Sequence, residues 1–231
     1  MTNLKLYLTF FLFLNYIACF AQDTLTQTKE RQASITPDMA LQMLKDGNKR
    51  FLEGNTLERD FSEQIKKTAN NQYPFAVILN CIDSRAPAEI LFDQGIGDIF
   101  NIRIAGNIVN EDILGSLEFA CKVSGAKLIL VLGHSNCGAI KGAIDDVKLG
   151  NLTELLSKIK PAVDATSYEG KKSSSNYEYV EEVAKQNVMD SMKDIHDRSP
   201  ILDSMIKNGD VKLEGGMYDL KTGKVEFYDD K

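Results

Sequence analysis

Two short motifs contain the residues whose types and spacing could support chemistry. Cys81-Ile-Asp-Ser-Arg85 follows one apolar run, and His134-Ser-Asn-Cys137 follows another. Two cysteine thiolates and one imidazole are a ligand set that suits zinc. Three protein ligands leave the fourth tetrahedral position to water or substrate, which is characteristic of a catalytic zinc site. The sequence therefore predicts a catalytic zinc centre at Cys81, His134 and Cys137.

An acidic and a basic residue accompany the first cysteine. Side chains two residues apart in an extended segment point to the same side. Asp83 would then share the side of Cys81, and Arg85 would continue it if the chain stays extended. Asp83 is a candidate for the fourth zinc ligand, or for the group that controls that position, and Arg85 could hold its carboxylate with two parallel hydrogen bonds. The alternative is a simple ion pair at the end of a strand.

Cys121 and the second histidine, His196, are expected to have no chemical role. Cys121 lies in the middle of a predicted helix, where packing is the simplest interpretation. His196 lies among charged residues at a predicted helix end, so we assign it nothing. If Cys19 is removed with a leader, as argued below, three cysteines remain, and an odd number does not make a disulfide framework.

The elements that must position the two motifs are short apolar runs separated by helical patterns. Strands are expected over residues 75–80, 99–104 and 127–132, with helices over 88–92 and 112–123 between them. The third run is almost continuously apolar, which is typical of a strand buried on both faces of a parallel sheet. This alternation predicts an α/β fold with a central, mainly parallel β-sheet flanked by helices. Both motifs would then lie at the carboxyl edge of the sheet, where such folds place ligand crevices.

The two ends of the chain add a helical arm and a hairpin. An N-terminal helix is expected over residues 36–54, with Thr36 as its cap and Pro37 at its first position. The final segment, 211–228, is expected to form a C-terminal β-hairpin with Gly223 in its turn. Beyond Cys137 the pattern is helical, with helices expected over 152–159, 177–196 and 200–208 and an exposed loop over 167–176.

The first 21 residues differ from the rest and predict export. They carry one charge, Lys5, and an apolar run that is shorter than the roughly 20 residues of a membrane span. Cys19 and Ala21 are small residues at the −3 and −1 positions of a cut before Gln22, as in a secretory signal peptide. The alternative is a lipoprotein signal that anchors the protein through a lipidated Cys19. Either leader predicts a bacterial periplasmic or secreted protein without a transmembrane segment in its mature chain.

The rest of the chain is expected to hold one domain. The polar residues 22–35 suggest a flexible leader, and residues 36–231 show no repeat and no linker that would divide them. Hydrophobic residues make up 43% of the chain and charged residues 26%, an ordinary composition for a soluble protein. The net charge of −6 argues against nonspecific binding of nucleic acid or of an anionic membrane surface, but not against a small anion held in a local pocket.

The two motifs resemble the signature of the β-carbonic anhydrase family, Cys-x-Asp-Ser-Arg followed further along the chain by His-x-x-Cys. The resemblance extends over roughly residues 36–228. It includes the segments 92–100, 103–108, 115–119, 132–139 and 218–224.

This resemblance implies a zinc enzyme, with one ion per subunit, that interconverts carbon dioxide and bicarbonate. Hydroxide generated at the zinc would attack carbon dioxide, with Asp83 accepting a hydrogen bond from it and Arg85 holding Asp83. The backbone N–H of Gly138, at an expected helix start, could hold bicarbonate oxygens, and Gln94 is a further candidate for contacting the substrate. The resemblance also implies a homodimer or homotetramer with active sites near the subunit interface.

Two other functions stay open at this stage. A carbon disulfide hydrolase of the same family would keep the fold and the zinc, and a substrate assay would separate it from a carbonic anhydrase. A noncatalytic zinc-binding protein would also keep the ligands, but a structural zinc site has no use for Asp83 and Arg85. A redox role for Cys81 and Cys137 would predict activity without metal.

Overall fold

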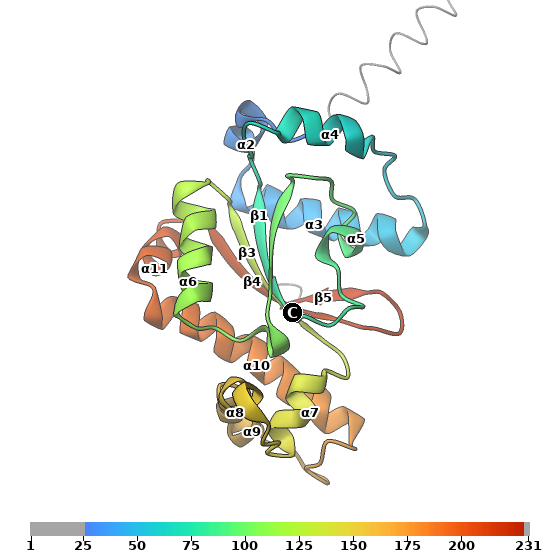
Figure 1. Cartoon of the computed structure of the whole chain (residues 1–231), viewed down its shortest axis with the longest axis vertical. Helices are drawn as coiled ribbons and strands as arrows, with labels where there is room; N and C mark the ends of the chain where they lie inside the picture. The colour runs from blue at the N-terminus through green and yellow to red at the C-terminus, as the bar shows by residue number, and fades with distance from the viewer. Residues whose placement is uncertain (1–25, 229–231) are drawn as a thin grey trace, which may run out of the picture.

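A five-stranded sheet forms the centre of the computed structural model, which describes residues 26–228 (Figure 1). Its strands lie in the order β2-β1-β3-β4-β5. The pairs β1–β2, β1–β3 and β3–β4 are parallel, and only β4–β5 is antiparallel. The mainly parallel sheet with a C-terminal hairpin is therefore confirmed. The strand bounds are β1 (Ala76–Asn80), β2 (Ile99–Arg103), β3 (Leu128–His134), β4 (Lys212–Tyr218) and β5 (Val225–Phe227).

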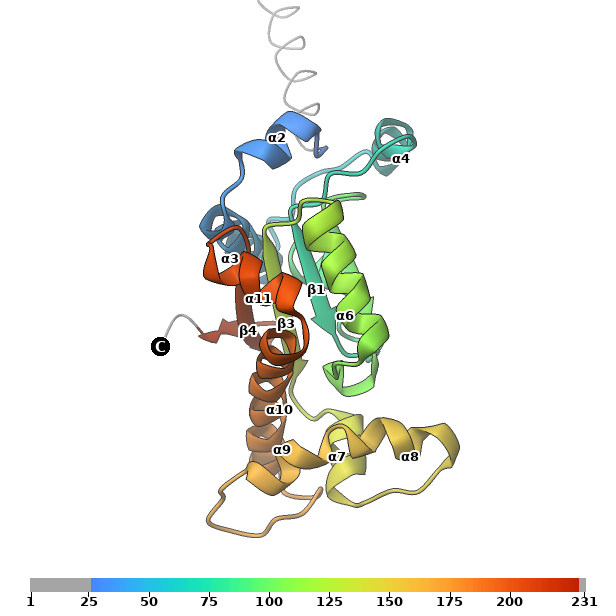
Figure 2. The same ribbon diagram turned by 90° about the vertical axis from the view of Figure 1, so that its left-hand side faces the viewer.

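Helices cover both faces of the sheet (Figures 1 and 2). Within residues 26–228, no helix is long and apolar enough to cross a membrane. In chain order the helices are α2 (Lys29–Ser34), α3 (Pro37–Glu53), α4 (Phe61–Thr68), α5 (Ala88–Leu91), the 3-10 turn η1 (Ala105–Asn107), α6 (Glu111–Glu118), the π-helical turn η2 (Phe119–Val123), α7 (Gly138–Ile144), α8 (Gly150–Ser157), α9 (Lys160–Ala165), α10 (Tyr177–Arg198) and α11 (Pro200–Lys207).

The central strands separate two apolar cores. All residues of β1 and β3 are buried, as expected for strands covered on both faces. Side chains of β1 alternate between the cores: Val77 and Leu79 join the core beneath α6 and α10, whereas Ala76 and Ile78 join the core beneath α3 and α5. Figure 2 shows α3 on one side of the sheet and α6 on the other. This three-layer arrangement holds the carboxyl ends of β1 and β3 next to each other.

Two expected helix boundaries are correct in detail. Thr36 caps α3 by accepting a hydrogen bond from the N–H of Met39, and Pro37 occupies the first position. The helix ends at Gly54, whose φ of +69° is a left-handed conformation that glycine adopts without steric cost. The hairpin turn likewise contains Gly223, with a φ of +81°. Caps and glycines are local signals, and sequence alone located them.

Part of the leader expected over residues 22–35 forms a helix, α2, in the structure. Thr28 caps α2 by accepting from the N–H of Arg31, so a hydrogen-bonded helical turn forms. The Gln32 amide then donates to the carbonyls of Pro74 and Ser124, which fastens α2 to the amino edge of the sheet. These tertiary bonds leave no mark in a polar stretch of sequence.

Other expectations need smaller corrections or lie outside the described residues. The helix expected over 112–123 is α6 followed by η2, and the one expected over 152–159 is α8, which begins at Gly150 and ends at Ser157. Helix α4 was not anticipated. The predicted signal peptide 1–21, Cys19 within it and the beginning of the leader fall outside residues 26–228.

Candidate metal centre

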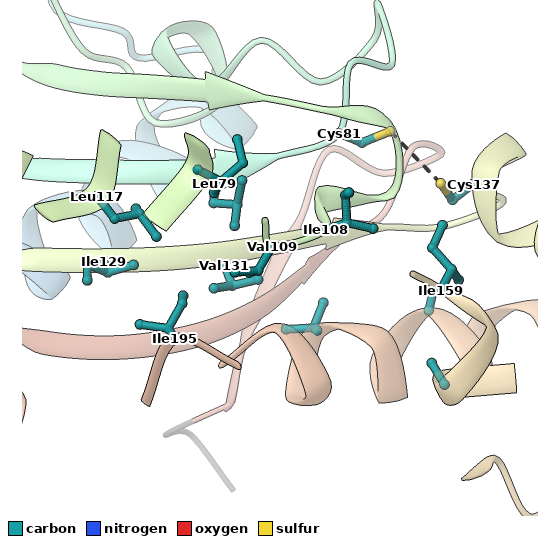
Figure 3. Close-up of a cluster of buried hydrophobic side chains, with 14 of the residues drawn as sticks. Leu79, Cys81, Ile108, Val109, Leu117, Ile129, Val131, Cys137, Ile159 and Ile195 are labelled. Atoms are coloured by element: carbon teal, nitrogen blue, oxygen red, sulfur yellow. Dashed lines mark hydrogen bonds between the residues drawn. The ribbon is translucent and has the colours of Figure 1, made fainter. Parts of the chain in front are cut away.

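Three potential ligands meet at the carboxyl edge of the sheet. Cys81 is the first residue after β1, His134 is the last residue of β3, and Cys137 immediately precedes α7. Because β1 and β3 are neighbouring parallel strands, both chains emerge at the same edge. One ligand atom from each residue lies within 4.8 Å of the others, and all three residues are buried. Figure 3 shows the two cysteines facing each other above Ile108 and Ile159.

The geometry of this cluster fits zinc. The sulfurs of Cys81 and Cys137 lie 3.9 Å apart, close to the roughly 3.8 Å that tetrahedral zinc–sulfur bonds of about 2.3 Å require. Nδ1 of His134 lies 2.9 Å from the carbonyl oxygen of Ser135, so a proton on Nδ1 can be donated to it. That tautomer leaves the Nε2 lone pair for a metal. Nε2 is buried and has no hydrogen-bond partner in the part of the chain that the structure describes.

The two thiols share negative charge. The hydrogen bond from Cys137 lowers the pKa of Cys81 to about 4 against the opposing effect of burial, with the N–H of Gly106 also donating to its sulfur at 3.3 Å. The same bond to Cys81, together with burial, raises the pKa of Cys137. Backbone N–H groups of Ala139 and Ile140, in the first turn of α7, favour the Cys137 thiolate. A divalent cation in place of the shared proton would stabilise both thiolates at once.

Asp83 and Arg85 form the expected pair beside the cluster. The Arg85 Nε donates to Oδ1 at 2.9 Å and its Nη2 donates to Oδ2 at 2.7 Å, so the two bonds are parallel. The chain does not stay extended, however, because the backbone N–H of Arg85 turns back to Oδ1 of Asp83 at 3.0 Å. The hydrogen bond from Arg85 is the main reason that the pKa of Asp83 lies well below its usual range. Oδ2 of Asp83 is 3.9 Å from Nε2 of His134, so the carboxylate borders the cluster.

Two further residues shape the site and were not assigned a role from the sequence. The guanidinium of Arg103, at the end of β2, donates from Nε to the carbonyl of Cys81 at 3.1 Å and from Nη2 to the carbonyl of Asp83. Ser135 accepts from the N–H of Leu220 through its hydroxyl oxygen at 2.9 Å, which ties the second motif to the hairpin. The motif pattern contains Ser135, but nothing in its spacing indicates this bond.

The other predicted site residues lie in different surroundings. Gly138 is the first residue of α7, next to Cys137. Gln94 donates its amide to the carbonyl of Phe92 and lines a cavity of about 140 Å³ whose walls include none of the three potential ligands. Cys121 is buried within η2 and remains a free thiol, as its packing role requires. His196 pairs with Asp203 at the surface, with 3.0 Å between Nδ1 and Oδ1.

The sequence matches known proteins over most of its length. The family model described as "Carbonic anhydrase" matches residues 76–225. A carbonic anhydrase of Mycolicibacterium smegmatis is 35% identical over 199 residues, which cover 83% of this chain and 93% of that protein. Carbonic anhydrase 2 of Mycobacterium tuberculosis is 33% identical, with 84% of this chain and 93% of the relative covered.

Solved structures share the fold. A tetrameric β-carbonic anhydrase from Sordaria macrospora has a TM-score of 0.63 at 26% identity, covering 72% of this chain and 86% of that one. The β-carbonic anhydrase CcaA has a TM-score of 0.65 at 27% identity, covering 81% and 87%. A Coccomyxa β-carbonic anhydrase in complex with acetazolamide has a TM-score of 0.65 at 26% identity, covering 72% and 77%.

Proposed function

The chain belongs to the β-carbonic anhydrase family, whose reaction is the hydration of carbon dioxide, and we propose that it carries out this reaction with one zinc ion per subunit held by Cys81, His134 and Cys137. The observation that carries the proposal is the buried cluster of two sulfurs and one unpartnered imidazole nitrogen within 4.8 Å. When bound, zinc supplies a Lewis acid that lowers the pKa of a water from about 15.7 towards 7.

The residues around the cluster would orient the attacking water and hold its proton. Arg85 engages both oxygens of Asp83, so this carboxylate is kept ionised and immobile. Oδ2 of Asp83, at 3.9 Å from Nε2 of His134, can accept a hydrogen bond from a water on the open side of the cluster. That bond would turn the lone pair of the water towards carbon dioxide. In this arrangement Asp83 is a hydrogen-bond acceptor rather than a fourth ligand.

Backbone groups complete the site. The N–H of Gly106 and those of the first turn of α7 point at the sulfurs of Cys81 and Cys137, which offsets the charge of the two thiolates. Arg103 holds the carbonyls on either side of Ile82 and thereby fixes the direction of the Cys81–Arg85 turn. The Gly138 N–H, adjacent to Cys137, remains our candidate for holding an oxygen of bicarbonate.

The direct test measures zinc content and carbon dioxide hydration in matched variants. Cys81→Ser should lose zinc and activity together. Asp83→Asn should keep zinc but turn over poorly, since the amide cannot accept hydrogen bonds through both atoms. Cys121→Ser is the control, because Cys121 is equally buried but outside the cluster. Full activity in both site variants would refute the proposed site.

The two alternative functions are separated by the same proteins. A carbon disulfide hydrolase would consume carbon disulfide and leave carbon dioxide hydration slow. A noncatalytic zinc protein would bind zinc and show no turnover, and the bidentate pairing of Asp83 with Arg85 argues against it. A redox protein would work after chelation of the metal.

We also propose that the protein assembles into a homodimer or homotetramer through the β2 edge of its sheet. Strand β2 pairs with β1 alone among the described strands, so its other edge is open. A groove beside it is lined by Phe100, Ile102 and Phe119, and Phe119 is 49% exposed. Exposed apolar side chains near an open strand edge are a feature of association surfaces. Further exposed apolar residues are Phe61, Ile65, Ile82, Ile90 and Ile96.

Light scattering after size-exclusion chromatography tests this assembly. The unmodified protein should have the mass of a dimer or tetramer, and Phe119→Glu should reduce it. Met189→Glu is the control, because Met189 is 46% exposed on α10, away from β2. A monomeric unmodified protein, or equal masses for both variants, would contradict the proposed interface.

Export is proposed from the sequence of the first 21 residues. In bacterial cells, the full chain should be cut before Gln22 and be found in the periplasm or the medium. A lipid-anchored protein would instead fractionate with membranes, and Cys19→Ala would release it. Recovery of the uncut chain from the cytoplasm would contradict both forms of export.

A further inference from the structure

We propose that helix α10 positions the metal ligands, through hydrogen bonds between the side chains of Asn187, Ser191 and Glu181 and the backbone turns that carry or contact those ligands. This inference rests on the proposed metal site. None of the three α10 residues lies in either ligand motif.

The first connection runs from Asn187 to Cys81 through one residue. The Nδ2 of Asn187 donates to the carbonyl of Gly106 at 2.8 Å, and the N–H of Gly106 donates to the sulfur of Cys81 at 3.3 Å. Asn187 is 3% exposed, so its amide lies in an apolar core and depends on this bond. The bond from Asn187 fixes the peptide plane between Gly106 and Asn107. Because this plane adjoins the Gly106 N–H, the bond also restricts the direction in which that N–H points.

Ser191 holds the next residue of the same turn. Its hydroxyl donates to the carbonyl of Asn107 at 3.1 Å. Asn187 and Ser191 are four residues apart, so they lie on the same face of α10. Both are polar residues on a face otherwise occupied by apolar side chains such as Val188 and Ile195. A face that only packed against the core would be apolar at these two positions as well.

The turn needs such anchors because its backbone is strained. Gly106 and Asn107 have φ values of +69° and +43°, two consecutive residues in the left-handed region. A non-glycine residue in this region costs of order 1–3 kcal/mol and persists only where its surroundings determine it. The two side chains of α10 bind the carbonyls of these two residues. Without them, the turn could relax and the Gly106 N–H could leave the sulfur.

Helix α10 also contacts the second ligand motif. The carboxylate of Glu181 accepts the backbone N–H of Asn136 at 2.7 Å. Asn136 lies between His134 and Cys137, and its φ of +55° is again left-handed. Each of the three left-handed residues next to the ligands is therefore bound by one side chain of α10. A single rigid helix of 22 residues thus fixes both ligand-bearing segments relative to each other.

The experiment compares zinc affinity and a spectroscopic signature in matched variants of the full zinc-loaded protein. Asn187→Ala removes the bond to Gly106, and Ser191→Ala removes the weaker bond to Asn107. Asn48→Ala is the control, because Asn48 is an equally buried asparagine that donates to backbone carbonyls of Leu91 and Gly223 far from the cluster. Zinc affinity is measured by competition with a chromogenic chelator, and the sulfur-to-cobalt charge-transfer band is recorded after cobalt substitution.

We expect Asn187→Ala to weaken zinc binding roughly 10- to 100-fold and to shift the cobalt band. Ser191→Ala should act in the same direction by a smaller factor and serves as the test if Asn187→Ala does not fold. Asn48→Ala should lower the melting temperature and leave affinity and band unchanged. Unchanged affinity in the foldable α10 variants, or an equal loss in Asn48→Ala, would overturn the inference alone. An unmodified protein that binds no zinc would overturn the proposed function as well.

Discussion

Replacing Gly106 with alanine tests how tightly the turn beside Cys81 is packed. The φ of +69° costs a non-glycine residue about 1–2 kcal/mol. A Cβ at this position would lie 2.5 Å from Cδ1 of Ile159 and 3.3 Å from Cβ of Ala139. Because Cδ1 is the far end of a flexible side chain, Ile159 can shift, and overpacking of this kind costs about 1–3 kcal/mol. We therefore expect Gly106→Ala to lose about 2–5 kcal/mol of the free energy of unfolding.

Gly209→Ala separates the two contributions. Gly209 has a similar φ of +76°, but no atom lies within 4 Å of the position of its Cβ, so only the conformational cost of about 1–2 kcal/mol applies. Both variants are unfolded with urea at fixed zinc and protein concentrations, and the rate of zinc release to a chelator is measured in parallel. Gly106→Ala should also release zinc faster, because its N–H donates to Cys81. Equal losses of stability and equal release rates in the two variants would refute the tight packing and the role of the turn in holding the ligand.

Three further predictions concern groups outside the cluster. Burial raises the pKa of Asp98 above its ordinary 3.8, so the folded protein loses stability as the pH rises past that value and the buried carboxyl must ionise. Asp98→Asn avoids this loss and should gain stability relative to the unmodified protein between pH 4 and pH 7, measured by urea unfolding; a pH-independent difference would contradict this. Burial raises the pKa of Cys121 to about 12, whereas the hydrogen bond from Cys137 lowers the pKa of Cys81, so maleimide labelling with peptide mapping at pH 8 should modify Cys81 after chelation and Cys121 only after unfolding; labelling of Cys121 in the native protein would contradict this. Arg59→Met should lose roughly 1–3 kcal/mol of the free energy of unfolding, because the buried carboxylate of Asp93 loses one guanidinium partner and keeps Arg50, whereas Lys193→Ala, which removes an exposed ion pair, should leave the free energy of unfolding nearly unchanged; similar losses in both would contradict the argument.

The parallel sheet could be predicted because its strands are continuous apolar runs. The expected strand over 127–132 is β3, although the strand continues to His134. Period and composition identify such strands, but their ends depend on pairing: β4 extends alongside β3 as far as the pair of His134 with Tyr218. Helix α2 and the change from α6 to η2 after Glu118 depend on tertiary contacts, and sequence periodicity does not record those contacts.

The ligands could be predicted because zinc requires particular side chains at particular spacings. Thiolates and an imidazole after neighbouring strands are visible in the sequence once the strands are known. The position of Gln94 was not predictable in the same way, since a glutamine can bond to any nearby backbone group. In the structure it bonds to the carbonyl of Phe92, in a cavity separate from the cluster.

The groups that support the ligands escape sequence analysis for a physical reason. A ligand is selected by its own chemistry, whereas a supporting side chain needs only one donor or acceptor at the right place. Asparagine at 187 and serine at 191 satisfy that need from positions 50 and 54 residues beyond Cys137, and nothing in their types distinguishes them from polar residues on a solvated face. Their burial distinguishes them, because a polar side chain that is only 3–5% exposed must have a hydrogen-bond partner. The partners here are the carbonyls of Gly106 and Asn107, in the left-handed turn beside Cys81. Burial of a polar side chain against a left-handed turn is therefore the feature by which such supports can be recognised, and it becomes visible only once the fold is known.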